Sequence, residues 1–75
     1  MRIISVKSAE DRKTYYVERY EDDQYGFVLK ARYATRFHIR EVDKALMRLC
    51  YEYPTQSHEF EVIEEPFHFR IVTRA

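Results

Sequence analysis

The stretch that decides the fold reads Phe37-His38-Ile39-Arg40-Glu41-Val42-Asp43-Lys44-Ala45-Leu46-Met47-Arg48-Leu49-Cys50-Tyr51-Glu52-Tyr53. Apolar residues recur in it at steps of three and four, at Ile39, Val42, Leu46, Leu49, Cys50 and Tyr53. This spacing predicts an α-helix with one apolar stripe. The other side of that helix carries Arg40, Glu41, Lys44, Arg48 and Glu52. The sequence before and after this stretch alternates as β-strands do, so we predict that one helix lies across one sheet.

Both ends of this helix are marked in the sequence. His38 is the preferred N-cap, because Glu41 then takes the capping-box position three residues later. Phe37 and Val42 then occupy the two positions of a hydrophobic staple. Pro54 disfavours helical geometry at the residue before it, which ends the helix near position 53.

Five further segments have the composition and alternation of β-strands. They span residues 1–7, 13–20, 25–33, 58–64 and 67–74. The second and third form a candidate antiparallel hairpin around the acidic turn at residues 21–24. The last two form either a hairpin or one long strand with a bulge, because their apolar positions shift from even to odd numbers across Glu65 and Pro66.

These elements predict a single α+β domain that comprises residues 1–75. It has two layers, a mainly antiparallel sheet of four or five strands and one helix, in the order β-β-β-α-β-β. The sheet residues expected to face the helix include Tyr15, Val17, Phe27, Leu29 and Ala31. We expect nearly complete burial of Leu46, Leu49, Phe27, Leu29, Phe60 and Phe69.

Composition narrows the classes of function. Thirteen basic and thirteen acidic residues cancel in a chain of 75 residues, which indicates neither a strongly basic nucleic-acid binder nor an acidic mimic of DNA. The single cysteine, Cys50, excludes an internal disulfide and is typical of a reducing compartment. Neither a signal peptide nor a membrane span is recognisable, so we expect a cytoplasmic protein with no membrane partner.

The residue patterns do not predict catalysis, a metal or a cofactor. His38, His58 and His68 are far apart in the sequence, whereas zinc ligands usually come in closely spaced pairs. Cys50 falls on the apolar stripe, where packing explains it. The acidic pairs at positions 22–23 and 64–65 lie in expected turns, where carboxylates are solvated. We therefore expect a protein that is not an enzyme and binds no cofactor.

The strongest surface signal lies on the sheet face that is turned away from the helix. The candidate partner-binding residues on this face are Tyr16, Tyr20, Lys30, Arg32 and Arg70, accompanied by Glu18, Val28 and Val72. Tyrosine and arginine together are typical of protein–protein contacts. The same residue types also stack on the bases of single-stranded nucleic acids. A third possibility is that they belong to a solvated sheet face that binds no ligand. Our first hypothesis is a protein-interaction module, and the alternative is a small single-stranded nucleic-acid-binding protein.

The aromatic content predicts self-association as well. Twelve of the 75 residues are Tyr or Phe, and one helix can cover only one face of the sheet. A sheet also has edges whose N–H and C=O groups another chain can satisfy. We therefore predict a homodimer formed through the sheet.

The stretch Leu29-Lys30-Ala31-Arg32-Tyr33-Ala34-Thr35-Arg36-Phe37, which leads on to Glu41 and Ala45, resembles small uncharacterised proteins encoded by phages and prophages of Gram-positive bacteria. In those proteins a strand ends in a corner of the A-x-R-F type and leads into an amphipathic helix. The resemblance covers about half of the chain. It implies a small α+β fold and an accessory role in contact with a host protein, and it assigns no functional residue.

Overall fold

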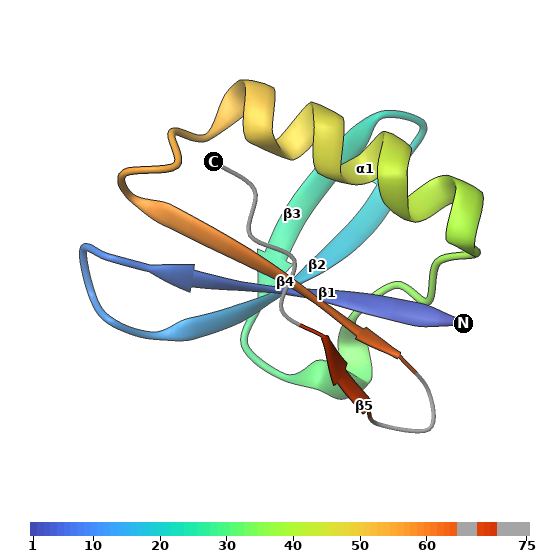
Figure 1. The fold of residues 1–75 in the computed structure, drawn as a ribbon, viewed down its shortest axis with the longest axis horizontal. Helices are drawn as coiled ribbons and strands as arrows, with labels where there is room; N and C mark the ends of the chain where they lie inside the picture. The colour runs from blue at the N-terminus through green and yellow to red at the C-terminus, as the bar shows by residue number, and fades with distance from the viewer. Residues whose placement is uncertain (65–67, 71–75) are drawn as a thin grey trace.

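The computed structural model describes residues 1–64 and the backbone of residues 68–70. Its elements are β1 (Arg2–Ser8), β2 (Thr14–Glu21), β3 (Gln24–Val28), the 3-10 helix η1 (Ala31–Tyr33), α1 (Ile39–Glu52), β4 (His58–Glu64) and β5 (His68–Arg70). The strands form an antiparallel sheet in the order β3-β2-β1-β4-β5, with α1 along one face (Figure 1). Within the described residues the α+β class and the antiparallel sheet under one α-helix are confirmed, and η1 is an additional element.

The core lies between α1 and the sheet. Side chains alternate along each strand, so every second residue of β1, β2 and β4 faces the helix. The buried cluster formed in this way contains Ile4, Val6, Val17, Phe37, Val42, Ala45, Leu46, Leu49, Phe60 and Val62. Leu46, Leu49 and Phe60 are buried as expected, whereas Phe27 is only partly buried at the margin of the cluster. The side chain of Phe69 lies outside the described residues.

The third strand is shorter than the sequence predicts. β3 ends at Val28, although the alternation of apolar residues continues to Tyr33. Leu29, which was expected to be buried under the helix, is 62% exposed, and Ala31 belongs to η1 instead of the sheet. Tertiary packing overrides the local pattern here, because residues beyond Leu29 pack against the other face of the sheet.

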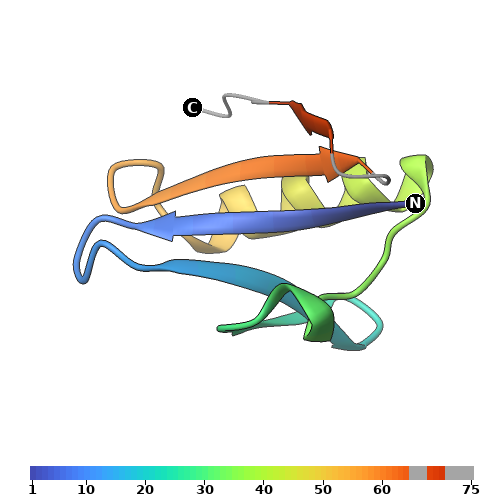
Figure 2. The same ribbon diagram turned by 90° about the horizontal axis from the view of Figure 1, so that it is seen from below.

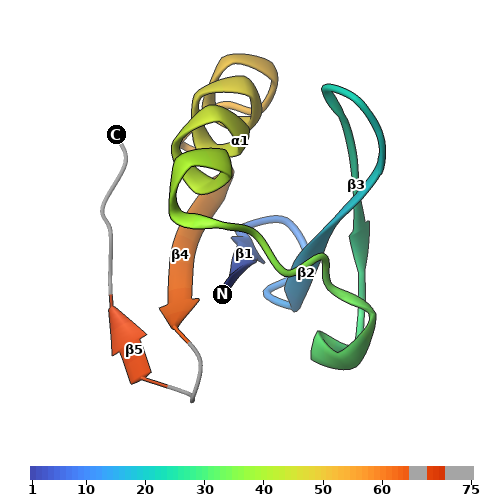
Figure 3. The same cartoon turned by 90° about the vertical axis from the view of Figure 1, so that its right-hand side faces the viewer.

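The face of the sheet turned away from α1 is the outer face. On it, η1 covers a second and smaller apolar cluster, which we call the outer cluster. Ile3 of β1 is paired with Ile63 of β4, and Ala34 completes the buried part of the cluster. Tyr16 and Ala31 pack against these three residues. Figures 2 and 3 show η1 and α1 on opposite sides of the sheet. The outer face of the sheet is therefore partly covered by the protein's own chain.

The chain returns to the helix side through the open end of the β1–β2 hairpin. The N–H of Thr35 donates to the carbonyl oxygen of Val17 at 3.0 Å, and its hydroxyl accepts the N–H of Arg19 at 2.7 Å. Phe37 and Arg2 exchange two backbone hydrogen bonds of 2.6 and 2.8 Å. These three residues, 35–37, thus fill the space where β1 and β2 diverge and satisfy backbone groups that the two strands leave unpaired.

The start of α1 has the geometry that the sequence predicts, with one exception. Phe37 is fully buried in the same cluster as Val42, as expected for a hydrophobic staple. His38 is the N-cap, and its N–H donates to the carboxylate of Glu41 at 3.1 Å. Ile39 is 61% exposed, so its predicted place on the buried stripe is wrong. Phe37 fills the core at this end of the helix instead.

The last two strands form a hairpin. β5 pairs antiparallel with β4, with Arg70 opposite Val62 and Phe69 opposite Ile63. Of the two arrangements that the sequence leaves open, this excludes one long strand with a bulge for the described backbone. The expected position of Val72 lies outside the described residues.

Leu46→Ala should destabilise the protein by about 2–5 kcal/mol, because it removes a buried side chain between helix and sheet and leaves a cavity. Urea unfolding followed by circular dichroism measures this change. Met47→Ala, at the next and exposed position, is the matched control and should change stability by less than about 0.5 kcal/mol. Equal effects of the two substitutions would contradict the observed orientation of α1.

Phe37→Ser should lower the thermal midpoint far more than His38→Ala. The first substitution removes a fully buried aromatic ring, whereas the second preserves the hydrogen bond from the backbone N–H of residue 38 to the Glu41 carboxylate. Thermal unfolding of both variants under the same conditions makes the comparison. A larger loss in His38→Ala would mean that the cap, and not the staple, fixes the start of the helix.

Candidate functional site

The two tyrosines that were predicted to bind a partner lie in β2 in different surroundings. Tyr16 is partly buried in the outer cluster. Tyr20 is 61% exposed near the end of the strand, and its ring lies over Gly26 of β3. A Cβ atom at position 26 would lie 3.2 Å from Cε1 of Tyr20, so the glycine leaves room for this ring.

The three predicted cations do not lie on β2 with these tyrosines. Lys30 directly precedes η1 and Arg32 belongs to it, because β3 ends before both. The guanidinium of Arg32 lies 5.1 Å from the ring centroid of Tyr33, which makes an exposed cation–π pair. The backbone of Arg70 belongs to β5, and β1 and β4 separate that strand from β2. The structure therefore distributes the predicted site over three separate elements.

Three carboxylates lie on the strands of the outer face. The alternation of the strands puts Glu18 of β2 and both Glu59 and Glu61 of β4 on this face. Lys7 of β1 is the cation among them, opposite Glu59 in the register. Because η1 lies on the same side and contains the exposed Arg32, this face carries both signs of charge.

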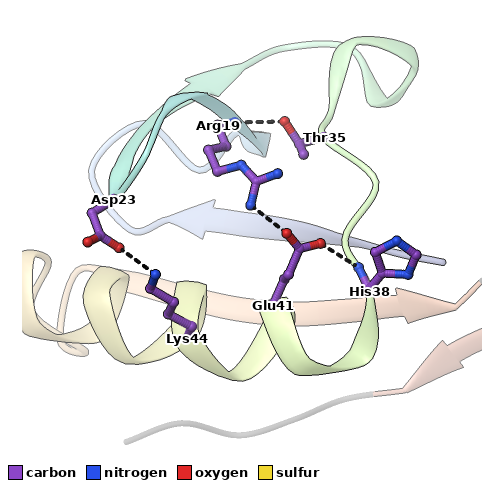
Figure 4. Close-up of polar contacts among 6 residues, drawn as sticks. All are labelled: Arg19, Asp23, Thr35, His38, Glu41 and Lys44. Atoms are coloured by element: carbon purple, nitrogen blue, oxygen red, sulfur yellow. Dashed lines mark hydrogen bonds and ion pairs between the residues drawn. The ribbon is translucent and has the colours of Figure 1, made fainter.

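Arg19 connects the sheet to the start of α1 (Figure 4). Its Nη1 atom lies 2.9 Å from Oε2 of Glu41, and its guanidinium lies 5.6 Å from the ring centroid of Phe37. The hydrogen bond from Arg19, followed by the one from the N–H of His38, holds the pKa of Glu41 below its ordinary value. These contacts join the helix cap to β2 and fix the orientation of α1, so we assign them a structural role.

The solvent side of α1 carries two large apolar side chains. Met47 is 76% exposed and Tyr51 is 86% exposed. They are four residues apart and therefore neighbours on the helix surface, opposite the buried stripe. An open groove of about 590 Å³ is lined by Asp23, Lys44, Met47, Arg48 and Tyr51. This groove lies between the exposed side of the helix and the β2–β3 turn.

A row of cations runs along the same side of the helix, at Arg40, Lys44 and Arg48. The Nζ atom of Lys44 lies 3.5 Å from Oδ1 of Asp23, and Nε of Arg48 lies 3.3 Å from Oε1 of Glu52. Among the residues that the structure describes, Arg40 makes no ion pair. Exposed ion pairs contribute little to stability, so these cations can exchange their partners for other carboxylates.

We call the surface formed by Arg40, Lys44, Met47, Arg48 and Tyr51 the α1 face. Met47 and Tyr51 are not among the predicted partner-binding residues. A signal for them is present in the sequence, because both fall opposite the apolar stripe, where an ordinary surface helix carries polar residues. The α1 face combines apolar area, a groove and three cations, with the exposed Asp43 one turn before Met47, and this combination makes it the candidate functional site.

Other kinds of site have less support in the described part of the chain. Residues 1–64 contain no group of three or more His, Cys, Asp or Glu side chains placed to hold a metal ion. In the same region no helix is long and apolar enough to cross a membrane. The thiol of Cys50 is partly buried against the core, which agrees with its predicted packing role.

Comparison with protein-family models, with curated proteins and with solved structures finds no match for this chain.

Glu41→Gln should weaken the dependence of stability on pH in the acid range. Because the folded pKa of Glu41 lies below its ordinary value, ionised Glu41 stabilises the fold at neutral pH, and this contribution is lost as the pH falls through the folded pKa. Thermal midpoints measured from about pH 7 down to about pH 3 should therefore fall less steeply in the variant than in the wild type.

Glu52→Gln, at the other end of the same helix, is the matched control. Glu52 pairs with Arg48 on the exposed surface and caps no backbone N–H in the described structure. At neutral pH this variant should lower the thermal midpoint less than Glu41→Gln does, because it removes only one exposed ion pair. If Glu41→Gln kept the wild-type dependence on pH, the contacts with Arg19 and His38 would not contribute to stability.

Proposed function

We propose that this protein is a non-enzymatic interaction module that binds an acidic segment of another protein through the α1 face. The single observation that carries this proposal is the exposure of Met47 and Tyr51 beside a row of three cations. A helix that served only to cover the sheet would gain nothing from two large apolar side chains on its solvent side. A partner that covers Met47 and Tyr51 would explain why these side chains are apolar.

The residue types on the α1 face suit a protein partner. Tyrosine, methionine and arginine are enriched in protein interfaces, and buried aromatic side chains commonly supply most of the binding energy. Tyr51 offers such an aromatic anchor. The groove beside Met47 can receive an apolar side chain of the partner in return. We therefore expect the partner segment to carry apolar anchors.

The charges on the α1 face favour acidic residues around those anchors. Arg40 has no carboxylate partner among the described residues, and Lys44 and Arg48 hold theirs only in exposed pairs. Carboxylates on a partner would complete this row and would accelerate association at low ionic strength. The resemblance of residues 29–45 to phage- and prophage-encoded proteins supports a host protein as the source of this segment.

The sheet-face site predicted from the sequence has weaker support. η1 covers part of that face, and Glu18 and Glu61 would repel the phosphates of a single-stranded nucleic acid. A homodimer through the sheet stays a prediction. Sedimentation equilibrium of the isolated protein at increasing concentration would detect it.

The test uses a synthetic amphipathic peptide as the probe, with leucine and phenylalanine on one side of its helix and aspartate and glutamate on the other. The peptide is added to isotopically labelled protein, and the amide shifts are followed by NMR. We expect the largest shifts at the α1 face and an affinity that falls with added salt. The double variant Met47→Ser, Tyr51→Ser should weaken binding by about tenfold or more.

The double variant Leu29→Ser, Tyr33→Ser is the matched control, because it removes one aliphatic and one aromatic side chain that are also exposed but lie elsewhere. It should bind the peptide as the wild type does. Absence of peptide binding, or binding that both double variants weaken equally, would overturn the proposal. Tighter binding of a single-stranded oligonucleotide to the same face would replace the protein partner by a nucleic acid.

A further inference from the structure

A second groove lies at the opposite end of the sheet from the start of α1, between the β1–β2 turn and the α1–β4 loop. The N–H of Ala9 in the turn donates to the carbonyl oxygen of Ser57 in the loop at 2.8 Å, so the two segments are held together. Figures 1 and 2 both show them side by side. The groove has a volume of about 500 Å³, which is within the range of small-molecule sites.

The chemistry of the lining favours an anion. Lys7 and Arg12 both line the groove, and neither makes an ion pair with a residue that the structure describes. Thr55 and Gln56 add a hydroxyl and an amide from the loop, and both residues are exposed. The acidic residue of the lining is Glu59, which lies opposite Lys7 in the register of β1 and β4. Hydrogen-bond donors therefore outnumber carboxylates around this groove.

Arg12 occupies an unusual backbone conformation for its side chain. Its φ is 59°, in the left-handed region where glycine or asparagine is the ordinary choice. Its N–H donates to the carbonyl oxygen of Ser8 at 2.9 Å, and the N–H of Ser8 donates to Lys13 at 3.0 Å, so the turn is fixed. An arginine costs conformational energy at such a position, and within the described residues its side chain makes no hydrogen bond or ion pair that would offset this cost.

We propose that this groove binds the phosphate group of a small phosphorylated molecule. Arg12 would bind the phosphate oxygens through paired N–H donors, and Lys7 would contribute a second positive charge. The groove is larger than a phosphate ion needs, so it also has room for the organic part of the ligand, close to Thr55 and Gln56. The site is on different elements from the α1 face, and the proposal does not depend on a protein partner.

The test compares three probes, inorganic phosphate, ribose 5-phosphate and ribose, by NMR titration of the labelled full chain at low ionic strength. We expect amide shifts at Ala9, Arg12, Gln56 and Ser57 with both phosphates and none with ribose. Ribose 5-phosphate should bind more tightly than inorganic phosphate, since its sugar occupies the rest of the groove. Equal affinity for the two would mean an anion site without room for an organic group and would overturn the small-molecule part of the proposal.

Arg12→Gly is the decisive variant, because glycine suits the left-handed backbone and should preserve the fold. It should weaken ribose 5-phosphate binding by about tenfold or more, as expected for the loss of charge-assisted hydrogen bonds. Lys13→Gly removes the neighbouring cation, which does not line the groove, and should leave the affinity unchanged. Equal losses in both variants, or shifts that appear at Arg40, Lys44 and Arg48 instead, would show only general attraction to cations and would overturn the site.

Discussion

The fold depends on the hydrogen bonds that residues 35–37 make to the diverging ends of β1 and β2. These residues carry the chain from one face of the sheet to the other, and they replace the pairing that β1 and β2 lack at this end. On one side of this passage η1 is held over the outer cluster, and on the other Phe37 enters the core. The N-cap His38 follows at once, so the position of α1 is determined by where this segment lies.

The sequence predicts those elements whose local pattern and tertiary packing agree. The stripe of α1, its N-cap and its staple all follow from the spacing of residues 37–53, and the alternation in β1, β2 and β4 identifies the core positions. The shorter β3 and η1 could not be predicted, because the alternation continues through Leu29 to Tyr33 and only the packing of Ala31 and Ala34 under the sheet reveals the departure. The spacing of apolar residues also predicts wrongly that Ile39 is buried. The side chain of Phe37, which precedes the helix, fills the core at this end instead.

The candidate site was harder to predict than the fold, for a physical reason. Alternation in a strand assigns a side chain to a face but does not say whether another part of the chain covers that face, and η1 covers part of it here. Both signs of charge occur on each side of the molecule. Arg40, Lys44 and Arg48 share α1 with Glu41, Asp43 and Glu52, whereas Glu18, Glu59 and Glu61 share the outer side of the sheet with Lys7 and Arg32. Charge alone therefore does not identify one face in the sequence.

The position of β1 in the middle of the sheet has a consequence for biosynthesis. β1 is synthesised first, yet one of its two neighbours is β4, and Arg2 is paired with Glu64, 62 residues later in the chain. Until β4 has left the ribosome, Ile4, Val6 and the stripe of α1 lack one of the strands that bury them. The domain therefore cannot reach its native state stepwise during translation, and the nascent chain presents apolar segments to chaperones and proteases until residue 64 is available.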